Sequence, residues 1–323
     1  MPMTPIRCAV IGVGYLGRFH AQKYAAADHA QLVAVADTDP EAAARVASEC
    51  GCRAVTDYRE LLGEVDAVSI VVPTTLHFEV ARECIANGVH VLVEKPITRT
   101  VEEAAELNRL AREKNVCLQV GHLERFNAAL MEVSRRPTPP LFIESHRLAP
   151  FKPRTTDVNV VLDLMIHDID IILDMVRSPV KSLAASGARV LSDALDIANA
   201  RIEFENGCVA NVTSSRVSLK SERKMRIFQK NAYVSIDFQN RGLSVHRLGD
   251  REAFPGIPEI TSENTVFEEG DALKVEIQAF LEAVRGEAPV IVSGEDGQRA
   301  LETAIRISEL LHGEAPVLGQ SAP

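Results

Sequence analysis

The fold of the first half of the chain is decided by residues 8–20, which read CAVIGVGYLGRFH. A short apolar run leads into Gly12, Gly14 and Gly17, and a segment with helical periodicity follows. Between a parallel strand and a helix, glycines at this spacing allow a tight bend, a close approach of the backbone to a pyrophosphate, and close packing of helix on strand. The first N–H groups of the helix then point at the anion. The stretch therefore predicts a dinucleotide-binding turn; a glycine-rich turn that binds nothing is the alternative.

Segments of strand length alternate with segments of helical period through the first 122 residues. We expect strands at 7–11, 31–37, 66–72, 89–94 and 116–121, and helices at 16–27, 40–49, 76–87 and 101–114. The last of these helices opens on Thr100, a favoured N-cap residue. Regular alternation of this kind is typical of a parallel sheet with helices on its faces. The sequence thus predicts an α/β fold in which residues 1–122 form a doubly wound Rossmann domain that binds NAD.

The choice of NAD over NADP depends on Asp37. This residue ends the second predicted strand, where the dinucleotide fingerprint places a carboxylate that accepts hydrogen bonds from the ribose hydroxyls. A carboxylate there repels a 2′-phosphate, and Thr38 and Asp39 follow without a neighbouring cation, although Arg59 could approach from elsewhere. Other residues at the glycine turn or at the carboxyl edge of the sheet are further candidates for contact with the cofactor. These are Tyr15, Leu16, Pro73, Thr74, His77, Glu94 and Lys95. For His77, a histidine with no special role is an equally good reading.

A candidate catalytic lysine follows the strand predicted at 89–94, in the stretch GVHVLVEKP at 88–96. Lys95 comes directly after the strand, at the edge where ligands bind in such folds. An ammonium group there can hold a substrate hydroxyl, stabilise a developing alkoxide or, when deprotonated, accept the proton. Taken alone, a lysine before a proline is more often solvated surface.

A second candidate group lies in DVNVVLDLMIHDIDIILDMV, residues 157–176, which has the apolar spacing of one long helix. Asp163 and His167 are four residues apart and therefore share a face. His167 could act as a general base towards a substrate hydroxyl, with Asp163 binding another hydroxyl or orienting the imidazole. An ion pair on a solvated face is the alternative. No third ligand at a suitable spacing is nearby, so we expect no metal.

Alternating polarity replaces the earlier pattern from Leu141 onward and predicts a second domain, 123–323, with an open and mainly antiparallel sheet. Asn206-Gly207 is a two-residue hairpin signal. The segment 249–267, rich in Pro, Gly and Glu, is expected to be a loop. Helices are expected at 272–285 and 295–311. These last two helices are candidates to pack back on the first domain.

Composition excludes several classes of protein. The 323 residues suffice for about two domains. A net charge of −10 argues against nucleic acid or an anionic membrane as a partner, and no apolar run is long enough to span a bilayer. The first residues lack the charged and apolar regions of a signal peptide, so we expect a cytoplasmic protein.

Taken together, four motifs resemble the Gfo/Idh/MocA family of NAD(P)-dependent oxidoreductases: GVGYLG at 12–17, Asp37, VEKP at 93–96 and LDLMIHDID at 162–170. The resemblance covers essentially the whole chain. It implies a Rossmann domain followed by an α/β domain, a homodimer or homotetramer formed through the second domain, and an active-site trio. Carried over by motif, that trio is Lys95, Asp163 and His167.

Two further stretches, GHLERFNAAL at 121–130 and RLAPFKPRTTDVNVVLDLMIHDID at 147–170, resemble the branch of the family that oxidises the 3-hydroxyl of UDP-N-acetylglucosamine or its uronic acid. This implies a sugar-nucleotide substrate and a 3-keto product for an aminotransferase, in the synthesis of 2,3-diamino sugars for lipid A or O-antigen. Cations in these stretches suit a pyrophosphate or carboxylate, and solvated loop cations that bind no ligand are the alternative. The candidate substrate-binding residues are Arg125, Asn127, Lys152, Arg154, Asp163 and His167, with Arg147 in the same cationic group. Dehydrogenation of a free sugar or cyclitol, or a non-catalytic NAD-sensing regulator, are the alternatives.

Overall fold

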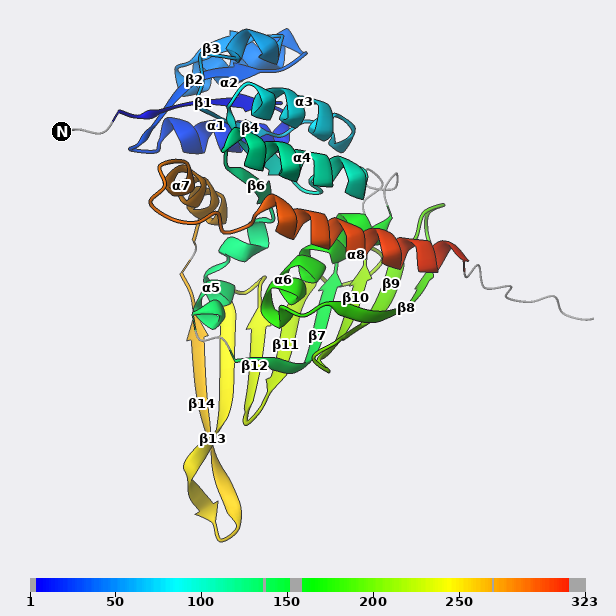
Figure 1. Ribbon diagram of the computed structural model, residues 1–323. Coiled ribbons are helices and arrows are strands. Elements are labelled where there is room, and N and C mark those ends of the chain that lie inside the picture. Colours follow the sequence, from blue (N-terminus) through cyan, green and yellow to red (C-terminus); the bar gives the residue numbers. More distant parts are fainter. Residues whose placement is uncertain (1–3, 136–137, 152–158, 269, 314–323) are drawn as a thin grey trace, which may run out of the picture. The chain divides into compact units, whose positions relative to one another are not determined.

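The computed structural model describes residues 4–135, 138–151, 159–268 and 270–313 (Figure 1). The chain divides into two compact units. The first runs to Phe126 and takes in Asp271–Leu301, whereas the second runs from Asn127 to Gly270 and takes in the last helix from Glu302. No helix in these described ranges is both long and apolar enough to cross a membrane.

The first unit is built on a parallel sheet of six strands, in the order β3-β2-β1-β4-β5-β6, among its described residues. The strands are β1 (Ile6–Ile11), β2 (Ala30–Ala36), β3 (Arg53–Val55), β4 (Ala67–Ile70), β5 (His90–Glu94) and β6 (Leu118–Gly121). β1 and β4 are neighbours although two strands separate them in sequence, so the strand order reverses beside β1. In a doubly wound sheet, ligands bind at the carboxyl ends of the strands at this switch point. The predicted Rossmann fold is confirmed.

The helices of the first unit begin and end at residues suited to those positions. They are α1 (Tyr15–Ala25), α2 (Pro40–Cys50), α3 (Thr74–Ala86), α4 (Val101–Lys114), α7 (Ala272–Val284) and the start of α8 (Gly294–Gly313), with 3₁₀ turns at Tyr58–Leu61 and Leu123–Phe126. Thr100 and Glu103 form a capping box at the start of α4, as two reciprocal side-chain to backbone hydrogen bonds. The apolar side of α7, including Ile277 and Phe280, packs into the core beneath β1, where Cys8 and Val10 are fully buried.

The second unit has an eight-stranded sheet in its described part, with the order β14-β13-β12-β11-β7-β10-β9-β8. Its strands are β7 (Pro140–Leu148), β8 (Val180–Ala188), β9 (Ile197–Phe204), β10 (Val209–Ser215), β11 (Glu222–Gln229), β12 (Ala232–Asp237), β13 (Gly242–Phe254) and β14 (Ile257–Val266). Only the β7–β10 pair is parallel, so the predicted mainly antiparallel sheet is confirmed. Gly207, at φ +87°, closes the β9–β10 hairpin that the Asn-Gly pair predicted.

One prediction for the second unit is wrong. The segment 249–267 is not a loop: β13 and β14 form a long hairpin that runs on beyond the other strands of the sheet, and it turns at Gly256 (Figure 1). Pro258 is compatible with a strand because β14 is at the edge of the sheet, where one side needs no N–H donor. The predicted long helix is present from Val160 to Val176, and residues 157–158 of the predicted range lie outside the described ones. Its Val161–Met165 turn is a π-helix that leads into α6 (Ile166–Val176).

Candidate functional site

The glycine turn of the first unit has the geometry of an anion cradle. Gly12 has φ +86°, and a Cβ on it would lie 2.5 Å from the carbonyl oxygen of Val71. A Cβ on Gly17 would lie 1.9 Å from the carbonyl oxygen of Gly12, so close packing of α1 requires this glycine. Around Gly14, by contrast, the space is open, and this residue is the N-cap of α1. A phosphate can therefore approach the first N–H groups of the helix without meeting a side chain.

Asp37 follows β2 and faces this turn. Its Oδ2 accepts the backbone N–H of Val13 at 2.8 Å, and its Oδ1 accepts the N–H of Asp39 at 3.0 Å. These hydrogen bonds fix the carboxylate beside the glycine turn, where it borders a cavity of about 380 Å³. The position and orientation suit a group that accepts hydrogen bonds from a ribose.

The cavity lies at the carboxyl edge of the sheet. Several of the residues that line it were not predicted from the sequence as cofactor contacts. It is lined by Ile11, Gly12, Gly14, Ala36, Asp37, Thr38, Thr56, Tyr58, Arg59, Val71, Val72, Pro73, Leu76, Glu79 and Val80. Its apolar wall suits an adenine ring. Arg59 does reach the cavity, but Glu79 and Glu83 lie 3.4 and 3.2 Å from its guanidinium, which is thereby already neutralised. The residues therefore fit the adenosine half of NAD.

Asp37 is expected to exclude NADP. Because like charges brought together at a binding site cost several kcal/mol, NAD+ should bind about 100-fold more tightly than NADP+. In the Asp37→Ser variant this ratio should fall at least tenfold, as measured by titrating each dinucleotide against the protein's fluorescence or heat of binding. Asp39→Asn is the matched control, because Asp39 is the N-cap of α2 and asparagine also caps helices. An unchanged ratio in Asp37→Ser would contradict the assignment.

The other residues predicted to contact the cofactor differ in their exposure and in their hydrogen-bond partners. Tyr15 is exposed at the first turn of α1 and Leu16 is half-buried beside it, whereas Pro73 and Thr74 begin α3 at the rim of the cavity. His77 is buried, with Nδ1 2.8 Å from the carbonyl oxygen of Pro96 and Nε2 2.9 Å from that of Val72. Both ring nitrogens thus contact the backbone, and His77 connects the loop after β4 to the loop after β5.

Glu94 and Lys95 lie at the end of β5, which is the carboxyl edge of the sheet. Lys95 is half-buried, and its backbone N–H is 3.3 Å from Oε2 of Glu94. Gly121 at the end of β6 lies against Glu94: a Cβ there would come within 2.8 Å of the Glu94 carboxylate, which would have to shift. His122 is a residue that sequence reasoning missed. Burial, followed by the charges of Lys95 and Arg125, lowers the pKa of His122 to about 3, so it is a neutral imidazole beside the lysine.

Two of the candidate substrate-binding residues flank the end of the first unit. Arg125 is half-buried, and its guanidinium is 3.3 Å from the carbonyl oxygen of Ile291. Asn127 caps α5 (Ala128–Ser134) by accepting the N–H of Ala129 at 3.0 Å. Lys152 and Arg154 lie outside the described residues.

Asp163 and His167 belong to the second unit. Asp163 is in the π-helical turn and His167 is in the first turn of α6, and both are half-buried. π-helical turns within helices are frequent at functional sites, since they displace side chains from the regular α-helical spacing. The side chain of Asn159 accepts the N–H groups of Val161 and Leu162 at 3.1 and 3.0 Å and so begins this helix.

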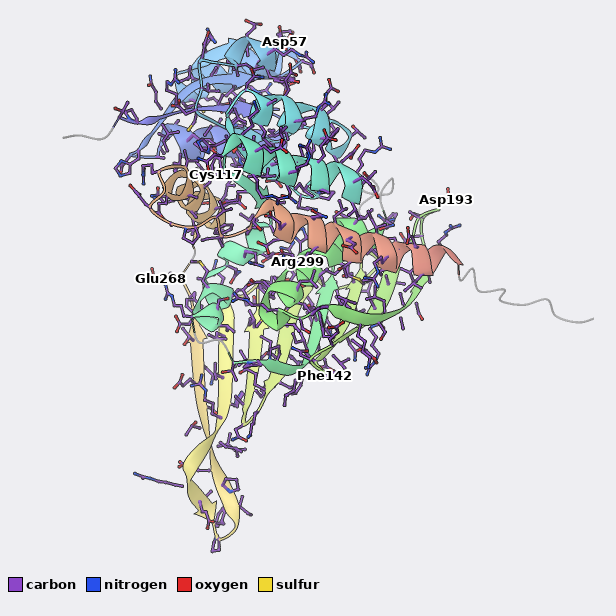
Figure 2. All side chains as sticks on the ribbon, viewed as in Figure 1. Asp57, Cys117, Phe142, Asp193, Glu268 and Arg299 are labelled. Atoms are coloured by element: carbon purple, nitrogen blue, oxygen red, sulfur yellow. The ribbon has the colours of Figure 1, made fainter. Side chains whose placement is uncertain are left out.

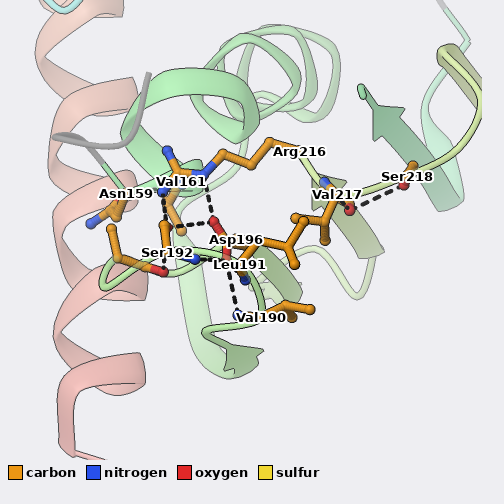
Figure 3. A network of polar contacts seen from close by, with 11 residues as sticks. Asn159, Val161, Val190, Leu191, Ser192, Asp196, Arg216, Val217 and Ser218 are labelled. Carbon is orange, nitrogen blue, oxygen red and sulfur yellow. Dashed lines mark hydrogen bonds and ion pairs between the residues drawn. The ribbon is translucent and has the colours of Figure 1, made fainter. Parts of the chain in front are cut away.

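A buried network anchors the start of the same helix (Figure 3). Asp196 and Arg216 form an ion pair at 2.9 Å, and both are almost fully buried. Burial alone raises the pKa of Asp196, but hydrogen bonds from Ser192, from the N–H groups of residues 190 and 191, and from Arg216 hold it well below its usual range. The loop held in this way accepts a backbone hydrogen bond from the helix: the N–H of Val160 donates to the carbonyl oxygen of Leu195 at 3.1 Å.

Arg147 belongs to the group of cations that could bind an anionic substrate, but in the structure it is paired with Asp168 inside the second unit. The Nε and Nη2 atoms of Arg147 on β7 donate to the two carboxylate oxygens of Asp168 on α6, at 2.7 and 3.2 Å. Both residues are at least 97% buried. The pair fixes α6 against the sheet one residue after His167, so Arg147 stabilises the second unit internally.

Comparisons with known proteins agree with this geometry. Residues 6–122 match the model of the Gfo/Idh/MocA oxidoreductase family with an NAD-binding Rossmann fold, and residues 132–235 match the model of the Gfo/Idh/MocA C-terminal domain. A UDP-N-acetylglucosamine 3-dehydrogenase of Acidithiobacillus ferrooxidans is 43% identical over 94% of this chain and 97% of its own length. The solved structure of that dehydrogenase superimposes with a TM-score of 0.89, covering 96% of this chain and 99% of the other.

A more distant relative is a scyllo-inositol 2-dehydrogenase of Bacillus subtilis, which is 28% identical over 97% of this chain and 96% of its own length. A scyllo-inositol dehydrogenase structure from Lactobacillus casei, at 20% identity and a TM-score of 0.80 over 96% of this chain and 98% of the other, shares the fold.

Proposed function

The chain belongs to the Gfo/Idh/MocA family of oxidoreductases, and from that premise we propose that it oxidises the C3 hydroxyl of UDP-N-acetylglucosamine to the 3-keto sugar. That it is an NAD-dependent oxidoreductase acting on a CH–OH group follows from the family and its named dehydrogenases. The single observation that carries the choice of substrate is 43% identity to a UDP-N-acetylglucosamine 3-dehydrogenase along nearly the whole of both chains.

Bound NAD+ supplies an acceptor for the hydride that leaves C3. In our proposal, the proton of the C3 hydroxyl goes to a base, either Lys95 or His167. When His167 is the base, the Lys95 ammonium stabilises the alkoxide that develops on the same oxygen. Asp163 orients the sugar ring through a hydroxyl group. Neighbouring His122 is neutral and therefore does not repel the Lys95 ammonium group.

The decisive experiment incubates purified protein with NAD+ and UDP-N-acetylglucosamine and follows NADH absorbance. We expect NADH to form, and more of it when glutamate and a sugar-nucleotide aminotransferase remove the keto product and release 2-oxoglutarate. The same assay with UDP-N-acetylglucosaminuronic acid and with scyllo-inositol separates the alternatives. Absence of NADH in the coupled assay, or turnover of the inositol alone, would reject the sugar-nucleotide assignment.

The negatively charged pyrophosphate of the substrate allows a second test of the proposal. We propose that Arg125, Asn127, Lys152 and Arg154 contact the UDP-sugar, the cations through its pyrophosphate. Replacing Arg125 or Arg154 by methionine should raise KM for the sugar nucleotide and leave the Kd for NAD+ unchanged. The 3-keto product would supply an aminotransferase in cytoplasmic synthesis of 2,3-diamino sugars for lipid A or O-antigen.

We further propose that the enzyme is a homodimer or homotetramer in which the β13–β14 hairpin contacts a second copy. All ten residues of β14 are exposed, and the side chains of the outer half of the hairpin stand away from the ribbon (Figure 2). Two cross-strand pairs there are apolar, Leu248 with Ile260 and Phe254 with Ile257. Exposed apolar pairs on an edge strand favour association. In sedimentation analysis, Phe254→Ser with Ile257→Ser should shift the protein to a smaller assembly; a monomeric parent protein would contradict the proposal.

A further inference from the structure

A chain of buried polar side chains runs through the first unit behind the end of β5. The hydroxyl of Tyr24 lies 2.9 Å from Oγ of Ser69, which lies 3.1 Å from Nδ1 of His20. Nε2 of His20 lies 3.2 Å from Oε1 of Glu94, and Oε2 of Glu94 accepts the backbone N–H of Lys95. One arrangement of protons satisfies every contact: Tyr24 donates to Ser69, Ser69 to Nδ1 of His20, and Nε2–H of His20 to Glu94.

Glu276 on α7 lies beside His20 and Glu94, the last two side chains of this hydrogen-bonded series. Its side chain is fully buried, and neither of its carboxyl oxygens has a hydrogen-bond partner among the described residues. One oxygen of Glu276, one of Glu94 and a ring nitrogen of His20 all lie within 4.8 Å of one another. Two carboxyl groups this close in a buried site do not both ionise.

The contacts decide which of the two carboxyl groups is ionised. Glu94 receives hydrogen bonds from the ring of His20 and from the backbone of Lys95, and these stabilise a carboxylate. Glu276 receives none from the described residues. Burial, followed by the charge of Glu94, raises the pKa of Glu276 well above its usual range. The proton of the pair is therefore on Glu276.

We propose that Glu276 is a positioning residue: it holds the one proton of the pair, so that Glu94 alone is ionised and anchors the backbone of Lys95. This inference rests on the proposed role of Lys95 in the dehydrogenase reaction. A second negative charge at Glu276 would repel Glu94 and loosen its hydrogen bonds to His20 and Lys95. Displacement of a catalytic group by about 1 Å can lower a rate by about 100-fold.

The first test reads the proton directly. Infrared spectra of the full-length protein with NAD+ at pH 8 should contain the C=O band of a protonated carboxylic acid, and Glu276→Gln should lack it. Glu282→Gln is the matched control on the same helix, since Glu282 is half-buried and bonded to Gln278, and it should keep the band. This measurement needs no substrate, so it remains decisive even when UDP-N-acetylglucosamine is not turned over.

The second test measures kcat and the Kd for NAD+. Glu276→Leu should lower kcat up to about 100-fold with little change in the Kd, and Glu276→Gln should recover most of kcat, because its amide is neutral and keeps an N–H donor. Three results would overturn the proposal. They are a parent protein without the carboxylic acid band, a Glu276→Gln variant as slow as Glu276→Leu, and a divalent cation that co-purifies with the parent protein but not with Glu276→Gln. The last result would make His20, Glu94 and Glu276 a metal site.

Discussion

Replacing Lys95 by methionine is expected to lower kcat by about 10²–10⁴-fold, which is the usual contribution of a positioned acid or base. Methionine keeps most of the apolar stem and removes the ammonium group, so the loss reports on charge and proton transfer. The Kd for NAD+ should change little, because the adenosine cavity lies around Asp37 and the glycine turn. Stopped-flow NADH formation and an equilibrium titration with NAD+ measure the two quantities. A kcat within threefold of the parent protein would remove Lys95 from the reaction.

Lys95→Arg and His167→Asn then identify the base. Arginine keeps the positive charge but does not deprotonate, so partial activity in Lys95→Arg would assign charge stabilisation to Lys95 and proton transfer to His167. In that case the acidic limb of the pH profile for kcat should disappear in His167→Asn. His122 does not confuse this measurement, since its pKa of about 3 keeps it neutral throughout the assay range.

Much of the first unit could be predicted because its signals are local. The positive φ at Gly12, the close approach at Gly17 and the capping box at Thr100 each follow from residues within a few positions of one another. Strand β3 was missed because three residues, Arg53–Val55, are too few to show a period. In the second unit, Pro and Gly in 249–267 suggested a loop, although at an edge strand these residues are compatible with pairing.

The parts of the site that the sequence did not reveal depend on pairs that are distant in the chain. Nothing near Glu276 indicates that it faces Glu94, since these residues come from α7 and β5. His122 could have been found, because it directly follows β6 at the same sheet edge as Lys95. Arg147 was read as a substrate cation because charge alone does not show whether a guanidinium faces a ligand or a buried carboxylate.

The Asp168→Ala variant is expected to lose about 3–5 kcal/mol of unfolding free energy, because it leaves Arg147 charged, buried and without its carboxylate partner. Urea unfolding followed by circular dichroism measures this loss. Because the ion pair holds α6 one residue after His167, kcat should also fall in the folded fraction. The double variant Arg147→Met with Asp168→Leu should recover most of the stability, since an apolar pair of similar volume replaces a buried ion pair at little cost.

Arg147→Met alone separates an internal role from substrate binding. It leaves the Asp168 carboxylate buried without the guanidinium, so stability should fall by a similar amount, while KM for the sugar nucleotide should stay near that of the double variant. A variant of normal stability with a strongly raised KM would instead mean that Arg147 binds the substrate. The ion pair with Asp168 would then form only while no substrate is bound. The buried, bidentate geometry favours the first result, because an arginine that binds a substrate phosphate must present its N–H donors to the ligand, whereas here two of them are directed at Asp168.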